Sequence, residues 1–179
     1  MPVAEPSSDR GVEIVKRFLD EAGVRFETIE HPPTFSTLEE AAAVGAEARH
    51  AAKTLALHDH GGWRLAVLPA NHRLDIDRAR RLLRATRHLR LATEDEMATE
   101  FPSYDVGALP PVGPMLPALE VIDIRLLYRE QIVCAGGDHR HAILLDPRDL
   151  LRVSEPRVGD ICEPDVVEHH KRFSDLPAP

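Results

Sequence analysis

Cysteine and aromatic residues are scarce in this sequence. Of the 179 residues only two are cysteine, Cys134 and Cys162, and aromatic side chains account for 4%. Two cysteines exclude a small secreted scaffold held by several disulfides, so we expect a reducing, cytoplasmic compartment. With so few aromatics the core has to consist of Leu, Val, Ile and Ala, and a hydrophobic fraction of 43% suffices for one globular domain.

Targeting segments, membrane spans and common catalytic motifs are also missing. No apolar run reaches the length of a membrane span, and the first ten residues, M-P-V-A-E-P-S-S-D-R, do not resemble a signal peptide. There is no G-x-S-x-G, no Walker loop and no G-x-G-x-x-G, and nothing nominates a serine or cysteine nucleophile. The net charge of −8 argues against a general DNA- or RNA-coating protein, although a local basic patch could still grip the end of an RNA.

The sequence does contain a series of short segments with recognisable ends. Capping residues and helical periodicity predict helices over 7–23, 37–45, from 75 or 77 to 83, 94–101 and from 147 onward. The predicted caps are Ser8 or Asp9 for the first helix, capping boxes at Thr37–Glu40 and Thr93–Glu96, and Asp75 or Asp77 for the third. Alternating or apolar runs predict strands over 24–29, 52–58, 63–69, 89–92, 119–124, 132–135 and 141–145, with a hairpin turn at 59–62. Hairpins mixed with helices indicate a single α+β domain over residues 1–153. The Pro-rich, charged residues 154–179 are expected to be a tail that lies on the surface or is partly disordered.

The stretch from Phe101 to Gly113, F-P-S-Y-D-V-G-A-L-P-P-V-G, has the composition of a fixed irregular loop. Gly107 permits a positive φ and a close approach of backbone to a ligand, and Pro110 and Pro111 fix two successive φ angles. Such a loop could present backbone N–H and C=O groups to a small polar ligand. The alternative is a Pro-rich connector between a helix and a strand.

Two residues in or beside predicted strands have a possible chemical role. Lys53 lies in an otherwise apolar strand, either at a sheet edge facing solvent or at the mouth of a pocket, where it would hold a phosphate or carboxylate. His139 lies on the glycine-rich turn G-G-D-H-R-H, either in an exposed loop or as a hydrogen-bonding or proton-relaying group. A metal at Asp138, His139 and His141 is a further alternative, but the spacing matches no zinc signature, so we expect no metal and no cofactor.

Seven arginines lie on and around the helix predicted after Leu74, with only two aspartates beside them. They form either a solvated helix face or a landing surface for an RNA backbone. The residues concerned are Arg73, Arg78, Arg80, Arg81, Arg84, Arg87 and Arg90.

Several short motifs, in this order and spacing, resemble the YbaK/prolyl-tRNA synthetase editing-domain family of aminoacyl-tRNA deacylases. They are H-P-P-T-F-S-T-L-E-E-A at 31–41, A-A-K-T-L at 51–55, P-A-N-H-R-L-D at 69–75, G-A-L-P-P-V-G at 107–113, A-G-G-D-H at 135–139 and D-P-R-D-L at 146–150. The resemblance covers about 12–153. It implies a curved, mixed, mostly antiparallel sheet flanked by helices, and hydrolysis of the ester that joins a wrong amino acid, commonly Ala or Cys, to proline tRNA.

The resemblance also assigns roles to residues. The catalytic group would be Lys53, Gly107, Pro111 and His139, and substrate binding would fall to His31, Phe35, Thr54, Ala108, Leu109, Gly136 and Gly137. Arg78, Arg81 and Arg84 would contact RNA. An activated ester needs no protein nucleophile, so the protein would mainly orient the ester, a water and the terminal ribose, whose hydroxyl assists the attack. The implied partners are the acceptor end of an aminoacyl-tRNA and prolyl-tRNA synthetase, with the protein a monomer or a homodimer that binds neither DNA nor a membrane.

Three departures from the family pattern concern the substrate. Ala142 replaces the carboxylate of cysteine-editing members, Asp138 replaces a small hydroxyl residue, and Pro110-Pro111 replaces a Gly-Gly form of the loop. They point to a side branch whose small amino acid can differ from Ala and Cys and is selected by size. The alternative function is a binding module that captures aminoacyl-tRNA or a synthetase without turnover.

Overall fold

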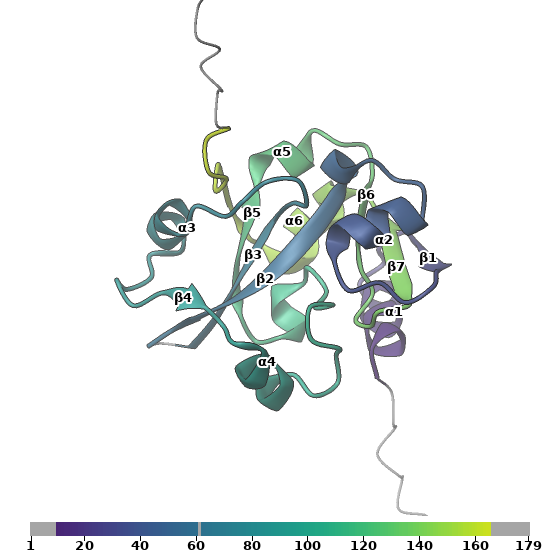
Figure 1. Ribbon diagram of the computed structural model, residues 1–179, viewed down its shortest axis with the longest axis horizontal. Helices are drawn as coiled ribbons and strands as arrows, with labels where there is room; N and C mark the ends of the chain where they lie inside the picture. The colour runs from purple at the N-terminus through teal and green to yellow at the C-terminus, as the bar shows by residue number, and fades with distance from the viewer. Residues whose placement is uncertain (1–9, 61, 166–179) are drawn as a thin grey trace, which may run out of the picture.

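The computed structural model describes residues 10–60 and 62–165, and these residues form one mixed sheet with helices packed around it (Figure 1). The order along the sheet is β1-β7-β6-β2-β3-β5-β8, and β4 pairs with β2 beside this path. The strands are β1 Phe26–Glu30, β2 Ala51–Asp59, β3 Gly62–Pro69, β4 Arg90–Leu91, β5 Leu119–Asp123, β6 Ile132–Ala135, β7 His141–Leu145 and β8 Arg157–Gly159. The helices are α1 Val12–Glu21, α2 Thr37–Ala43, α3 Ile76–Leu83, α4 Glu94–Glu100, α5 Ile124–Leu127 and α6 Pro147–Ser154, with 3₁₀ turns η1 Ala48–His50 and η2 Gly113–Met115.

The hairpin of β2 and β3 is the centre of the sheet. Its register places Lys53 opposite Leu68 and His58 opposite Trp63. The pairs β1–β7, β6–β7, β2–β3 and β2–β4 are antiparallel, whereas β2–β6, β3–β5 and β5–β8 are parallel. The predicted α+β class and mostly antiparallel sheet are therefore confirmed.

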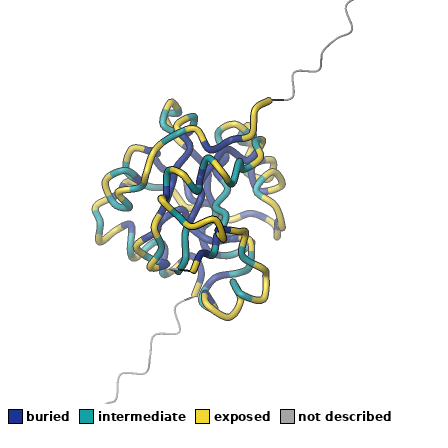
Figure 2. Tube along the Cα trace, turned by 90° about the vertical axis from the view of Figure 1, so that its left-hand side faces the viewer, coloured by how far each residue is buried: buried dark blue, intermediate teal, exposed yellow. Residues whose placement is uncertain are grey.

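The two faces of the central hairpin contribute side chains to two apolar cores, because successive side chains of a strand point to opposite faces. Ala52 and Ala56 belong to the larger core with α1, the 101–116 loop and α6. Leu57, one position on, belongs to a second core beneath α3. Figure 2 shows buried segments running through the middle of the molecule, with exposed segments around them.

Helix starts follow the predicted capping residues with two corrections, at α1 and α2. The Thr93 hydroxyl accepts from the Glu96 N–H and the Glu96 side chain accepts from the Thr93 N–H, which confirms the predicted capping box of α4. Asp75 caps α3. The cap of α2 is Ser36, not Thr37, because the Ser36 hydroxyl accepts from the Glu39 N–H. The cap of α1 is Gly11, whose neighbour Val12 begins the helix, and not Ser8 or Asp9, which lie outside the described residues.

The segment after α6 differs from the expected surface tail. Strand β8 pairs in parallel with β5, and Leu74 forms a bridge with Cys162. Ile161 and Cys162 are completely buried in the core beneath α3. The chain through Cys162 is thus part of the sheet and its packing, and residues 166–179 of the predicted tail lie outside the described residues.

Candidate functional site

The Pro-rich loop is anchored in the core, and one exposed glycine lies at its surface. Gly107 is exposed and has a φ of +85°, a conformation that favours glycine. From Ala108 to Gly113 every residue is buried, and Leu109 and Val112 pack in the larger core. The predicted fixed loop is therefore present, with Pro110 and Pro111 beneath the surface that Gly107 forms.

The glycine-rich turn between β6 and β7 is tied to the Pro-rich loop. Asp105 donates its backbone N–H to the Gly137 carbonyl at 3.0 Å, and its carboxylate accepts from the His139 N–H at 3.2 Å. Gly137 has a φ of +97°, and a Cβ there would lie 2.9 Å from the Gly11 backbone, so only glycine fits. Asp105 thus donates one hydrogen bond and accepts another, and together they fix the position of His139 relative to Gly107.

The segment after β1 packs against the same glycine-rich turn as the Pro-rich loop does. His31 donates its N–H to the Arg140 carbonyl at 2.8 Å, and Thr34 donates to the His139 carbonyl at 3.0 Å. Phe35 is 75% exposed, and its ring lies 5.0 Å from the His139 ring. The predicted residues Phe35 and His139, 104 positions apart in the sequence, are therefore neighbours at one surface.

These three segments enclose a small hollow. Its volume is about 10 Å³, which is about the space that one water molecule needs. The structure brings together the predicted residues Phe35, Gly107, Ala108 and His139 here. The complete lining is Thr34, Phe35, Ser36, Thr37, Glu40, Gly107, Ala108, Ala135, Asp138 and His139.

Glu40 is a lining residue that the sequence analysis missed. It is only 4% exposed, and its Oε2 lies 3.5 Å from Nε2 of buried His31. Burial, and secondarily the charge of Asp138, raises the pKa of Glu40 to about 7. No local signal marks it, because the sequence T-L-E-E is typical of a helix start, where a glutamate ordinarily faces solvent.

Comparison with known proteins identifies the family. Residues 31–153 match the aminoacyl-tRNA editing domain. The chain belongs to this family. A crystal structure described as a candidate trans-editing enzyme for prolyl-tRNA synthetase aligns with 90% of this chain and 100% of its own, at 29% identity and a TM-score of 0.76. The hypothetical protein APE2540 aligns with 83% of this chain and 99% of its own, at 28% identity and a TM-score of 0.75. Comparison with curated proteins finds no match.

Not every predicted site residue lines the hollow of this editing domain. Lys53 donates from Nζ to the carbonyl oxygens of His72 and Ala70, and partial burial lowers its pKa. Thr54, on the opposite face of β2, has a buried hydroxyl without a hydrogen-bond partner among the described residues. Neither is part of the lining, and His31 lies behind Glu40 rather than at the surface.

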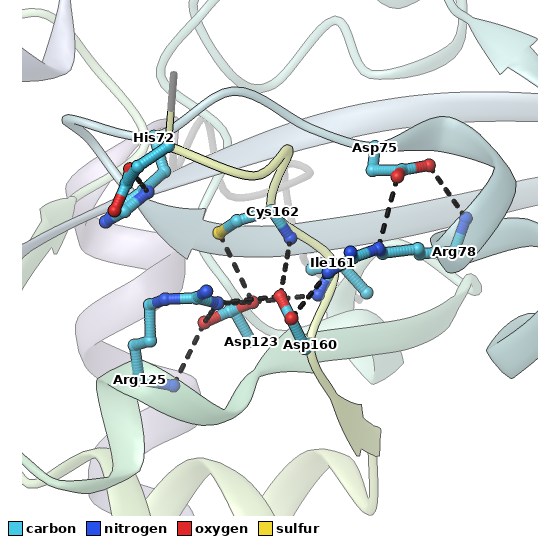
Figure 3. A network of polar contacts seen from close by, with 9 residues as sticks. His72, Asp75, Arg78, Asp123, Arg125, Asp160, Ile161 and Cys162 are labelled. Carbon is cyan, nitrogen blue, oxygen red and sulfur yellow. Dashed lines mark hydrogen bonds and ion pairs between the residues drawn. The ribbon is translucent and has the colours of Figure 1, made fainter. Parts of the chain in front are cut away.

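A second polar cluster lies where β5 meets the segment after β8 (Figure 3). Asp123, Asp160 and Cys162 bring three potential metal ligands within 4.8 Å of one another. The Arg125 guanidinium, however, contacts Asp123 at 3.1 Å and Asp160 at 2.8 Å, and Asp160 also pairs with Arg78. Because two arginines already neutralise both carboxylates, the cluster fastens β5, α3 and the C-terminal segment together, and a divalent cation would have to displace Arg125.

The arginines on and beside α3 differ in their ion pairs and in their exposure to solvent. Arg78 pairs with Asp75 and Asp160. Arg81 and Arg84 are exposed, and Arg84 ends the helix in a left-handed conformation.

No helix in the described part of the chain is long and apolar enough to cross a membrane.

Proposed function

We propose that this editing domain acts in trans as a hydrolase that removes a small amino acid, such as alanine, from mischarged proline tRNA. The observation that carries the proposal is the water-sized hollow between Phe35, Gly107 and His139 in a chain of the editing family. The neighbour described as a candidate trans-editing enzyme for prolyl-tRNA synthetase supports the same substrate class.

The geometry favours attack by water rather than by a side chain. Burial raises the pKa of both thiols, that of Cys162 to about 12, and neither cysteine lines the hollow. The Ser36 hydroxyl is engaged as the cap of α2. A water at the mouth of the hollow would lie beside His139 and the loop around Gly107, and backbone groups there would stabilise the developing oxyanion. The substrate's ribose hydroxyl would assist the attack.

The remaining predicted residues have supporting roles in this proposal. Lys53 would anchor the terminal phosphate or adenosine. Its ammonium group would then donate to the substrate as well as to the carbonyl oxygens of Ala70 and His72. Arg81 and Arg84 offer exposed charge to the tRNA backbone, whereas Arg78 would have to exchange its carboxylate partners for phosphate.

The test is deacylation of proline tRNA charged with Ala, Ser, Cys or Pro, with protein in substoichiometric amount. We expect turnover of one small amino acid, a loss of about 100-fold in kcat/KM for His139→Ala, and a weaker KM for Lys53→Ala. Tight binding without turnover on any ester would support the alternative, a module that captures aminoacyl-tRNA. Intact deacylation by Lys53→Ala would contradict the anchoring role.

A further inference from the structure

Glu40 is a buried acid whose charge the fold does not satisfy. One of its oxygens, Oε1, is buried and has no hydrogen-bond partner within residues 10–60 and 62–165. Leaving such an atom unpaired costs free energy, so a group that is absent from the free protein is expected to pair with it. Since Glu40 lines the hollow, that group would come from the substrate.

The neighbouring histidine does not fill this role. His31 Nδ1 lies 2.8 Å from the Pro32 carbonyl oxygen, which can only accept, so Nδ1 carries the hydrogen. In neutral His31 the Nε2 atom therefore faces Glu40 Oε2 with a lone pair, at 3.5 Å. This arrangement suits a protonated Glu40 in the free protein and leaves Oε1 open.

The charges around Glu40 favour a cation. Asp138, on the β6–β7 turn, lines the same hollow and acts on Glu40 as a like charge. The other titratable groups that face Glu40 are His31 after β1, Cys134 on β6, whose thiol is protonated, and His139 at the rim. The described residues that line the hollow include no lysine and no arginine, so a positively charged substrate group meets two carboxylates.

We propose that Glu40 binds the α-ammonium group of the aminoacyl ester. This inference rests on the proposed function, which places that ester at the hollow. In an alanyl ester the ammonium is one bond from the carbon next to the reacting carbonyl. Binding it at Glu40 would therefore also fix the carbonyl beside Gly107 and His139.

The proposal makes a statement about specificity that size exclusion does not. A pocket that selects its substrate by size alone accepts an ester whose amino group is replaced by a hydroxyl, because the aminoacyl and hydroxyacyl esters are nearly isosteric. A carboxylate that binds the ammonium rejects it, since a charge-assisted hydrogen bond is lost. The editing domain would thus act on aminoacyl esters with a free amino group and spare hydroxyacyl esters of the same shape.

The experiment compares alanyl-tRNA with lactyl-tRNA, whose ester carries a hydroxyl in place of the ammonium, under single-turnover conditions. We expect the wild-type protein to prefer the alanyl ester by about 10- to 100-fold, and Glu40→Gln to bring the ratio close to one. Glu120→Gln is the matched control, because Glu120 is an equally buried glutamate away from the hollow. Circular dichroism checks that both variants are folded.

The outcomes separate this inference from the proposed function. An unchanged alanyl-to-lactyl ratio in folded Glu40→Gln would overturn the role of Glu40 while the hydrolase stands. If the wild type cleaves neither ester, the hydrolase fails. The role of Glu40 is then decided by binding of amide-linked alanyl-adenosine and lactyl-adenosine to the same variants. A preference for the alanyl compound that Glu40→Gln loses supports the role, and equal binding contradicts it.

Discussion

Two glutamates in this protein share the same burial but not the same surroundings. Glu40 and Glu120 are each 4% exposed, and burial raises the pKa of each to about 7. Glu120 accepts the backbone N–H of Gly113 through Oε2 at 2.7 Å, whereas its Oε1, like that of Glu40, has no hydrogen-bond partner among the described residues. Glu40 has only the long contact to His31 and lines the hollow.

The difference shows how a binding carboxyl can be told from a structural one. Glu120 holds the start of η2 to the start of β5, so its main partner is the fold's own backbone. Glu40 accepts no backbone N–H among the described residues, and it lines the hollow together with Phe35 and His139. Burial, a raised pKa and an unpaired Oε1 alone would nominate both residues. The hydrogen bond of Glu120 to Gly113 and the place of Glu40 in the lining of the hollow distinguish them.

The largest expected effect is on stability and concerns Glu120. Glu120→Ala removes the acceptor of a buried N–H and leaves a cavity at the end of the Pro-rich loop. We expect the free energy of unfolding to fall by about 3–5 kcal/mol at pH 5, whereas Glu120→Gln keeps an oxygen for Gly113 and loses far less. Urea unfolding of both variants measures this. If Glu120→Ala were as stable as the wild type, Glu120 would not be a structural carboxyl and the comparison would fail.

Local sequence signals predicted most elements of the sheet but not its C-terminal edge. The strands at 63–69, 132–135 and 141–145 were recognisable because each is a run of apolar or alternating residues flanked by glycine, proline or charge. Strand β8 was missed because Arg157, Val158 and Gly159 are too few to show a period, and the strand exists through its pairing with β5. The burial of Ile161 and Cys162 likewise depends on tertiary packing, since a Pro-rich, charged composition predicts a solvent-exposed segment.

The site was predictable where it depends on backbone and not where it depends on packing. Gly107 and the proline pair indicated a fixed loop, and glycines indicated the turn that carries His139. Glu40 was not found, because a glutamate in the first turn of a helix ordinarily faces solvent and favours the helix dipole. Its burial follows from the packing of α2 on β2 and β6, which no local pattern encodes.

The pH dependence of stability sharpens the comparison, with a smaller effect. Both glutamates have a folded-state pKa of about 7, above the ordinary 4.5, so the folded state holds extra protons between these values. Their stabilisation is complete below about pH 4.5 and lost as the pH rises through 7, on the order of 3 kcal/mol for each group. Urea unfolding from pH 4.5 to 8 should show this fall, and Glu40→Gln and Glu120→Gln should each remove about half of it.

A result for one variant only would break the symmetry between the two residues. The aspartates with lowered pKa, such as Asp138 and Asp160, titrate below their ordinary 3.8 and do not contribute in this pH range. If Glu40→Gln left the slope unchanged while Glu120→Gln abolished it, Glu40 would be ionised in the free protein at pH 5. It would then be ready to accept an ammonium without losing a proton first.

The smallest expected effect tests what surrounds each carboxyl. Asp138 acts on Glu40 but is not among the groups that shift Glu120. Asp138→Asn keeps an oxygen for the N–H groups of Arg140 and His141 while it removes the negative charge. The Glu40 titration midpoint should therefore fall by a fraction of a pH unit and that of Glu120 should stay in place. Carbon-13 NMR of labelled glutamate carboxyls follows both midpoints in one sample. Equal shifts at the two residues would indicate a change in the whole fold. A shift at Glu40 alone would show that the negative charge of Asp138 acts on Glu40. The hollow would then have two acidic groups close enough to attract one ammonium group.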